Sequence, residues 1–509
     1  MKQTDHKKIK TLGELKDSGY TVVSVKDELR RNLMSKLKNR EEIFPGIIGY
    51  DNTVILELKN AILSRHDFIL LGLRGQAKSR ILRALVSLLD EYIPIVEGSE
   101  INDNPFNPIS RASIEKIEKY GKDTPIEWIP REQRYSEKLA TPDVSIADLF
   151  GDLDPIKAAT KRLHYAHEGA IHYGIIPRTN RGIFVINELP DLQPRIQVGL
   201  LNILEEKDIQ IRGFPIRIPL DILIAFSANP EDYTNRGNII TPLKDRIDSQ
   251  IITHYPRTIE EGIKITRQEA WENRAITGHA VTDVPHFFRE IVEYIAHEAR
   301  QSELIDQKSG VSARLPISCM EVLIGNAERR AISNNTQKTR LRISDFQAIV
   351  PAITGKIELV YEGEQEGVTN VARILIGKAV KHVFEKYYPL PQSGGKKRVE
   401  NLKPEIEAVI SWFAGDNLLT IDVPGSDEQY IKSLEKAKPL ETLAKKYFPK
   451  EFLRDEHDLA VAKEFILEGL HQNSFLSKFE TDGNATYKDL VESIFNGIPD
   501  DDHDMDLYA

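Results

Sequence analysis

The N-terminal half of the chain alternates short apolar runs with helical patterns. An amphipathic helical pattern spans about residues 52–64, and the runs that follow contain almost no polar positions. Compact apolar runs between helices are typical of a parallel sheet covered on both faces. The expected strands are 68–71, 93–96, 182–186, 222–226 and 250–253. The pattern therefore predicts an α/β fold with a parallel sheet.

Strand patterns almost disappear after about residue 258, and long helical patterns replace them, as in 287–296 and 371–380. We expect a helical lead-in over 1–43, an α/β nucleotide-binding domain over 44–257, a helical domain over 258–355 and an all-helical extension over 356–509. The acidic stretch from Pro499 predicts a disordered tail, because like charges repel one another. The polar stretch 102–137 is too long for a simple connection and predicts an insertion.

Length and composition narrow the class of protein. A chain of 509 residues is expected to form two to four domains. The single cysteine, Cys319, excludes an internal disulfide and a cysteine zinc cluster, which fits a reducing cytoplasm. No apolar run is long enough to cross a bilayer, and no secretory signal is expected at the N-terminus. The net charge of −10 argues against a dedicated nucleic-acid-binding domain.

The strongest chemical motif lies between an expected strand and an expected helix. Run 68–71 leads into a glycine-containing loop and then into a helical pattern, which is the context of a phosphate-binding loop. Backbone N–H groups of such a loop surround phosphates, the lysine reaches the β and γ oxygens, and the hydroxyl ligates Mg²⁺. Alanine replaces the usual glycine before the lysine. The motif alone therefore leaves the alternative that its similarity to a phosphate-binding loop is due to chance. The expected nucleotide-binding residues are Gly72, Leu73, Arg74, Gly75, Gln76, Ala77, Lys78, Ser79 and Arg80.

Two later strands end in polar residues that fit the same site. Run 182–186 ends in Asn187 and Glu188, where Asp-Glu is usual. The glutamate orients and polarises the attacking water, and the preceding residue holds the hydration shell of Mg²⁺. Asn187 brings no charge, so we expect the site to bind Mg²⁺ more weakly. We still expect the site to be catalytically active. Run 222–226 leads to Asn229, whose amide is placed to position the water.

These stretches resemble a known group of proteins over residues 44–350. Segments 182–192, 197–206, 227–232, 240–248 and 310–318 are similar to the magnesium-chelatase I-subunit and MoxR branch of AAA+ ATPases. The resemblance implies an AAA+ P-loop core followed by a helical lid. It places a helix-2 insert at 164–180 and an inserted β-hairpin at 208–218, although an ordinary loop and hairpin remain alternatives.

The resemblance also assigns roles to two arginines. Arg246 matches the arginine finger, which reaches the γ-phosphate of a neighbouring subunit, and Arg314 matches the second sensor of the lid; each could instead be a surface arginine. An arginine that acts across a subunit boundary implies a ring, by resemblance a hexamer. The partner expected from this branch is a protein with a von Willebrand A domain.

Three functions stay open at this point. The favoured one is an ATP- and Mg²⁺-dependent motor that remodels a protein. The second is the ATPase subunit of a magnesium or cobalt chelatase for tetrapyrroles. The third is a nucleic-acid motor, for which Arg212 and Arg217 in the hairpin supply few charges. His164, His167 and His172 are interpreted as ordinary loop histidines, because no suitably spaced carboxylate or cysteine accompanies them.

Overall fold

The computed structural model describes residues 8–160, 168–211, 217–230, 238–274, 284–388, 390, 402–415, 417–481 and 483–490. The chain forms two compact units, Met1–Tyr255 and Pro256–Ala509. Within the described ranges, no helix is both long and apolar enough to span a bilayer.

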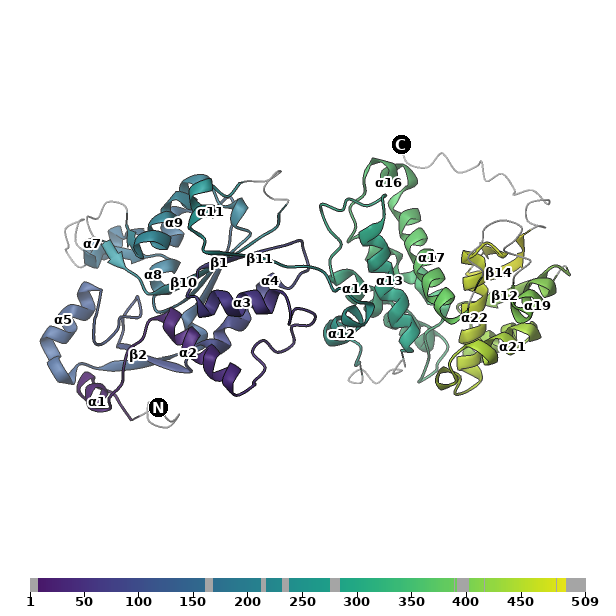
Figure 1. The fold of residues 1–509 in the computed structure, drawn as a ribbon, viewed down its shortest axis with the longest axis horizontal. Helices are drawn as coiled ribbons and strands as arrows, with labels where there is room; N and C mark the ends of the chain where they lie inside the picture. Colours follow the sequence, from purple (N-terminus) through teal and green to yellow (C-terminus); the bar gives the residue numbers. More distant parts are fainter. Residues whose placement is uncertain are drawn as a thin grey trace. The chain divides into compact units, whose positions relative to one another are not determined.

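The first unit contains the predicted parallel sheet (Figure 1). Its five strands all run parallel to their neighbours. In order across the sheet they are β11 (Ser249–Ile252), β1 (Phe68–Leu71), β10 (Ile222–Ala228), β7 (Gly182–Asn187) and β4 (Tyr135–Leu139). The α/β class predicted from the apolar runs is confirmed.

Alternate residues of the three central strands β1, β10 and β7 build two separate cores. Phe68 and Leu70 pack in one cluster with α2 (Val25–Lys38), α3 (Val54–Leu63) and α4 (Lys78–Ala84). Ile69 packs in the other cluster with α9 (Pro194–Glu206). Successive side chains of a strand point to opposite faces, so a fully apolar run requires helices on both sides. Figure 1 shows α2 and α3 on one side of the sheet and α9 and α11 on the other.

Two expectations about the sheet are wrong. Run 93–96 lies in β2 (Tyr92–Val96), which pairs antiparallel with β3 (Ile126–Pro130) in a separate two-stranded sheet. The fifth parallel strand is instead β4, which begins inside the stretch expected to be an insertion. β4 is an edge strand of partly exposed residues, and Arg83 pairs with Glu137 on it. An edge strand carries charged residues and so lacks the apolar run of a central strand.

The remaining elements of the first unit are short. β5 pairs antiparallel with β6, and β8 pairs antiparallel with β9, which forms the predicted hairpin up to a turn outside the described residues. The bounds are α1 (Leu12–Asp17), α5 (Arg111–Tyr120), α6 (Ile146–Leu149), β5 (Gly151–Leu153), α7 (Pro155–Thr160), β6 (Ile171–Tyr173), α8 (Ile175–Arg178), β8 (Asp208–Gln210), β9 (Arg217–Pro219) and α11 (Thr241–Arg246).

The second unit is largely helical. Its helices are α12 (Ile259–Glu269), α13 (His286–Gln301), α14 (Arg314–Ser333), α15 (Val350–Thr354), α16 (Tyr361–Glu366), α17 (Val368–Tyr387), α19 (Pro404–Phe413), α20 (Asp427–Leu434), α21 (Lys438–Tyr447) and α22 (Glu456–Gln472).

The extension after residue 355 is not all-helical as predicted. It contains an antiparallel three-stranded sheet in the order β12 (Leu419–Asp422), β14 (Asn484–Asp489) and β13 (Leu476–Thr481). These strands are short and mix buried residues with exposed charged ones. The sequence therefore contains no compact apolar run that would predict them.

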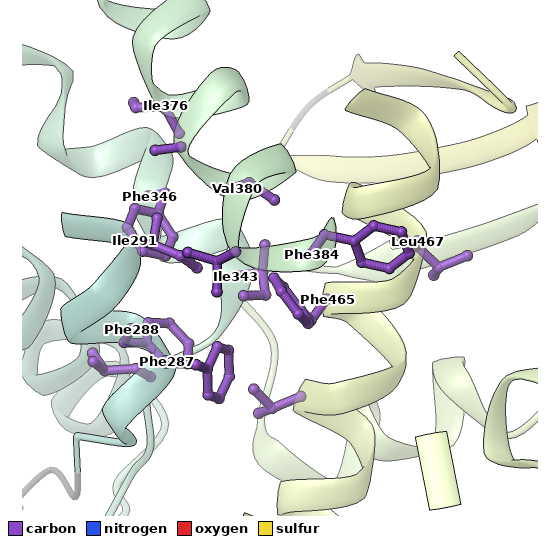
Figure 2. Packing of buried hydrophobic residues seen from close by; sticks show 14 of the residues in the cluster. Phe287, Phe288, Ile291, Ile343, Phe346, Ile376, Val380, Phe384, Phe465 and Leu467 are labelled. Atoms are coloured by element: carbon purple, nitrogen blue, oxygen red, sulfur yellow. The ribbon is translucent and has the colours of Figure 1, made fainter. Parts of the chain in front are cut away.

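One hydrophobic core joins the segments before and after residue 355. Figure 2 shows Phe287 and Phe288 of α13 beside Phe384 of α17 and Phe465 of α22. The rings of Phe287 and Phe465 are 5.2 Å apart, and those of Phe384 and Phe465 are 5.8 Å apart. Aromatic pairs at such distances are favourable. The helices on either side of residue 355 therefore bury one another, and the boundary at 355/356 stays a prediction.

Candidate functional site

The loop between β1 and α4 has the tight backbone that a phosphate-binding loop requires. Gly75 has φ +76° and Ala77 has φ +56°, both in the left-handed region. A Cβ at Gly72 would overlap the side chains of Thr253 and Gln76. Glycine is therefore required at 72 for space and is favoured at 75 for its conformation. Ala77 adopts a glycine-like conformation at a cost of about 1 kcal/mol.

Lys78 is held inside the loop. Its side chain is buried, and its ammonium donates hydrogen bonds to the carbonyls of Gly72 and, at 3.0 Å, of Leu73. Ser79 and Arg80 follow on the first turn of α4 and are exposed. The loop thus gathers one ammonium, one hydroxyl and the first N–H groups of a helix, all of which favour phosphate oxygens.

Three side chains that the sequence did not single out support this loop. The Tyr50 hydroxyl lies 3.1 Å from the carbonyl oxygen of Gln76 and 2.5 Å from that of His254. The Thr253 hydroxyl donates to Gln76 Oε1 at 2.6 Å, and the Tyr255 hydroxyl donates to the Arg74 carbonyl at 3.0 Å. Burial raises the pKa of Tyr50, so its hydroxyl stays a donor. Each contact joins residues far apart in sequence, which no local motif signals.

The sheet brings the predicted polar strand ends together. Leu71 of β1 lies opposite Ala228 of β10, and Ile186 of β7 lies opposite Phe226 of β10. Gly72 N–H donates to the Ala228 carbonyl at 3.1 Å, so the start of the loop lies directly beside Asn229. Carboxyl ends of neighbouring parallel strands are the usual place for a ligand in α/β proteins.

Glu188, directly after β7, has a strained backbone conformation. Its φ and ψ are +54° and +50°, a left-handed conformation unusual for glutamate. Its N–H donates to Ser227 Oγ at 3.4 Å, and that hydroxyl donates to Asn187 Oδ1 at 3.0 Å. Strained residues of this kind cluster at functional sites. The sequence predicted Asn187 and Glu188, but only the structure shows that Ser227 links them to β10.

The two predicted arginines lie in different units. Arg246 ends α11, and its guanidinium pairs with Glu205 of α9 at 2.6 Å. Arg314 begins α14 in the second unit, where its N–H donates to Ser312 Oγ at 3.1 Å. Their roles as arginine finger and second sensor stay predictions.

Of the three neighbouring histidines, the structure describes His172. His172 lies on β6 and contacts Arg178 at 3.3 Å, whereas His164 and His167 lie outside the described residues, as does Arg212. Over the described part of the chain, no group of three or more His, Cys, Asp or Glu side chains could hold a metal.

Comparison with known proteins supports the resemblance. No family model matches the chain. The magnesium-chelatase 38 kDa subunit of Rhodobacter capsulatus is 28% identical over 237 residues, covering 44% of this chain and 59% of that protein. The same subunit of Cereibacter sphaeroides is 28% identical over 208 residues, covering 40% and 56%. The chloroplastic magnesium-chelatase subunit ChlI of Nicotiana tabacum is 24% identical over 343 residues, covering 63% and 75%.

The chain is homologous to the I subunits of magnesium chelatase. The resemblance to this branch of AAA+ ATPases is thereby confirmed, although the chain spans less than two thirds of the length of the two bacterial relatives.

Similar solved structures include a chain of the BchI–BchD complex of magnesium chelatase, with a TM-score of 0.33, 20% identity and coverage of 64% of this chain and 98% of that chain. Another is NtrX of Brucella abortus in complex with ADP, with a TM-score of 0.37, 12% identity and coverage of 73% and 67%. Both TM-scores are low.

Proposed function

We propose that this chain binds Mg²⁺·ATP at the carboxyl ends of β1, β10 and β7 and hydrolyses it. One observation carries the proposal. The loop that begins at Gly72, with its buried Lys78, lies beside the strand end that carries Asn229, and the next strand carries Glu188. A phosphate anchor and two polar groups able to position water therefore belong to adjacent strands.

The residues present fit a nucleotide accompanied by magnesium. Gly72 leaves no room for a side chain, and the left-handed residues at 75 and 77 turn the chain so that its N–H groups can face phosphate. Mg²⁺ in such sites is held by one or two protein groups, phosphate oxygens and water. Ser79 would ligate the ion, and Asn187 would accept a hydrogen bond from its water.

The hydrolytic step assigns a separate task to each side chain. Glu188 accepts the proton of the attacking water, and Asn229 holds that water in line with the γ-phosphate. Lys78 stabilises negative charge on the β and γ oxygens. Magnesium, when bound, would supply further positive charge at the same oxygens. The hydrogen bonds of Tyr50, Thr253 and Tyr255 to the loop hold it in place before the reaction begins.

The motor itself is proposed to be a ring, by family resemblance a hexamer. Arg246 would complete the site of a neighbouring subunit, and Arg314 would couple the lid to the nucleotide. Hydrolysis would then move the lid and the hairpin against a protein partner, such as one with a von Willebrand A domain.

Homology favours one second candidate, the ATPase subunit of a chelatase that inserts Mg²⁺ or Co²⁺ into a tetrapyrrole. An experiment that distinguishes the chelatase subunit from the remodelling motor is to replace the 38 kDa subunit of a reconstituted Rhodobacter capsulatus magnesium chelatase with this chain. Metal insertion would support the chelatase, and its failure with an active ATPase would support the remodelling motor. The nucleic-acid motor is not proposed, because Arg217 of the hairpin is paired with Asp208 at 3.4 Å.

The decisive test of the site is Glu188→Gln. The variant should bind ATP with unchanged affinity in calorimetry and lose about 100-fold or more of its hydrolysis rate, the usual effect of removing a general base. Glu206→Gln, an equal chemical change at the exposed end of α9, should keep the wild-type rate. Hydrolysis by Glu188→Gln at the wild-type rate would refute the assignment.

A further inference from the structure

A cavity of about 640 Å³ lies at the edge of the sheet opposite the nucleotide site. Its lining includes Arg181, which directly precedes β7, and Asp221, which directly precedes β10. The same strands lead to Glu188 and Asn229 beyond their other ends, roughly 23–26 Å away along the chain at about 3.3 Å per residue. Pockets of this size are typical of small-molecule sites.

Most charged groups in the cavity wall are matched to one another. Arg134 donates to both carboxylate oxygens of Glu28 at 2.7 Å, and both side chains are almost fully buried. At the rim, Arg31 pairs with Asp90 at 2.6 Å. Such pairs neutralise themselves and leave little affinity for a ligand.

Arg181 and Asp221 are different. Arg181 is 5% exposed, and its guanidinium donates to the Pro94 carbonyl at 2.7 Å. The Asp221 carboxylate accepts from the Val25 N–H at 3.0 Å. Within the described ranges, no ion pair joins either group to an opposite charge.

Burial opposes the charge of both groups, although each also lies in the favourable field of the other's opposite charge. It lowers the pKa of Arg181 and raises the pKa of Asp221. An uncompensated buried charge is costly, and a ligand that neutralises it recovers that cost. An anion would satisfy Arg181 alone, and a cation would satisfy Asp221 alone.

An aromatic wall completes the cavity. The rings of Tyr20 and Trp128 meet edge to face at 6.0 Å, and the Trp128 indole is fixed by its N–H bond to the Ile9 carbonyl at 3.0 Å. Tyr92 and Val23 extend the apolar part of the lining. Rigid aromatic side chains offer contact area to an apolar group at little entropic cost.

We propose that this cavity binds a free α-amino acid with an apolar or aromatic side chain. The ligand carboxylate lies at Arg181, its ammonium at Asp221 and its side chain against Tyr20 and Trp128. An amphoteric ligand can form an ion pair with each of these two groups at once, and charge-assisted hydrogen bonds are the stronger kind.

The first test is calorimetry and saturation-transfer NMR with each of the twenty L-amino acids on the full chain. One or more apolar or aromatic members should bind, and the N-acetyl and carboxamide derivatives of each should bind at least about 10-fold more weakly, because each lacks one charge. No binding by any of the twenty at about 10 mM would refute the proposal, a limit corresponding to less than about 3 kcal/mol of affinity. Equal binding of either derivative would refute it too.

Variants locate the site. Arg181→Gln should abolish binding, but its burial makes misfolding a second explanation. Thr21→Trp avoids this difficulty, because Thr21 is exposed and lines the cavity, so a large side chain there fills it without touching the buried charges. Thr369→Trp, at an exposed position of α17, is the matched control and should bind as wild type. Full affinity in Thr21→Trp with an unchanged melting temperature would overturn the proposal, whatever the ATPase rate.

Discussion

Ser227 Oγ donates a hydrogen bond of 3.0 Å to Asn187 Oδ1, and it also accepts the N–H of Glu188 at 3.4 Å. This hydroxyl joins β10 to β7 where the two strands present the groups assigned to hydrolysis. An amide oxygen accepts this bond as an aspartate would, but it brings no charge to the ion. The position of Asn187 is thereby preserved while its electrostatic contribution is lost.

Asn187→Asp should therefore strengthen magnesium binding. A carboxylate at the same place adds a full charge near the ion's hydration shell, and we expect the magnesium concentration for half-maximal hydrolysis to fall about 3- to 10-fold, equivalent to about 1 kcal/mol. ATPase rates measured across a magnesium titration check this. Adding Ser227→Ala to the Asn187→Asp variant should cancel part of the gain, and an unchanged titration curve would contradict the expectation.

Ala77→Gly should stabilise the first unit. Ala77 has φ +56°, which glycine adopts without steric cost, so the free energy of unfolding should rise by about 1 kcal/mol. Denaturant unfolding followed by circular dichroism measures this. Ala84→Gly is the matched control, because Ala84 has φ −66° at the end of α4 and should lose about 0.5–1 kcal/mol. Destabilisation by both changes would show that the loop conformation is not strained.

Mixing two inactive variants tests whether Arg246 acts across a subunit boundary. Arg246→Ala should bind ATP normally and hydrolyse it about 1000-fold more slowly, the effect typical of losing an arginine finger. Mixed with Glu188→Gln, it should regain part of the wild-type rate, because some interfaces then combine an intact Glu188 with an intact Arg246. Glu205→Gln, which removes only the partner of Arg246 on α9, should keep hydrolysis. Absence of any recovery in the mixture would contradict action in trans.

Glu293 should make the second unit pH-sensitive. Burial raises its pKa to about 7 against an ordinary value of 4.5, opposed by the hydrogen bond from Thr266 and by Arg300. The folded state therefore holds a proton that the unfolded state releases, so stability is lost as pH rises from about 4.5 to about 7. The loss amounts to about 3 kcal/mol at most.

Glu293→Gln should remove this dependence and melt at a higher temperature than wild type at pH 8. Melting temperatures between pH 5 and 8 give the measurement. Glu303→Gln, at an exposed position in the same unit, should keep the wild-type slope. Parallel slopes for wild type and Glu293→Gln would show that Glu293 is ionised in the folded state.

The sequence by itself determined the tight loop that we propose to bind phosphate, the polar residues Glu188 and Asn229 that follow two strands, and most of the parallel sheet. Each is a contiguous segment whose local pattern follows from a local requirement. Central strands buried on both faces must be apolar throughout, and a loop that surrounds phosphate must turn tightly before a lysine.

Only the tertiary structure decided which strands join the sheet and what supports the site. β4 replaced β2 because an edge strand lacks the apolar run that identifies central strands. Tyr50, Thr253 and Ser227 reach the site through contacts between distant segments. The ion pair of Arg134 with Glu28 in the cavity at the other edge of the sheet likewise joins residues 106 positions apart. Local periodicity indicates which side of a helix or strand is buried, but it does not indicate which other element packs against that side. Contact partners from distant segments are therefore determined only by the tertiary fold.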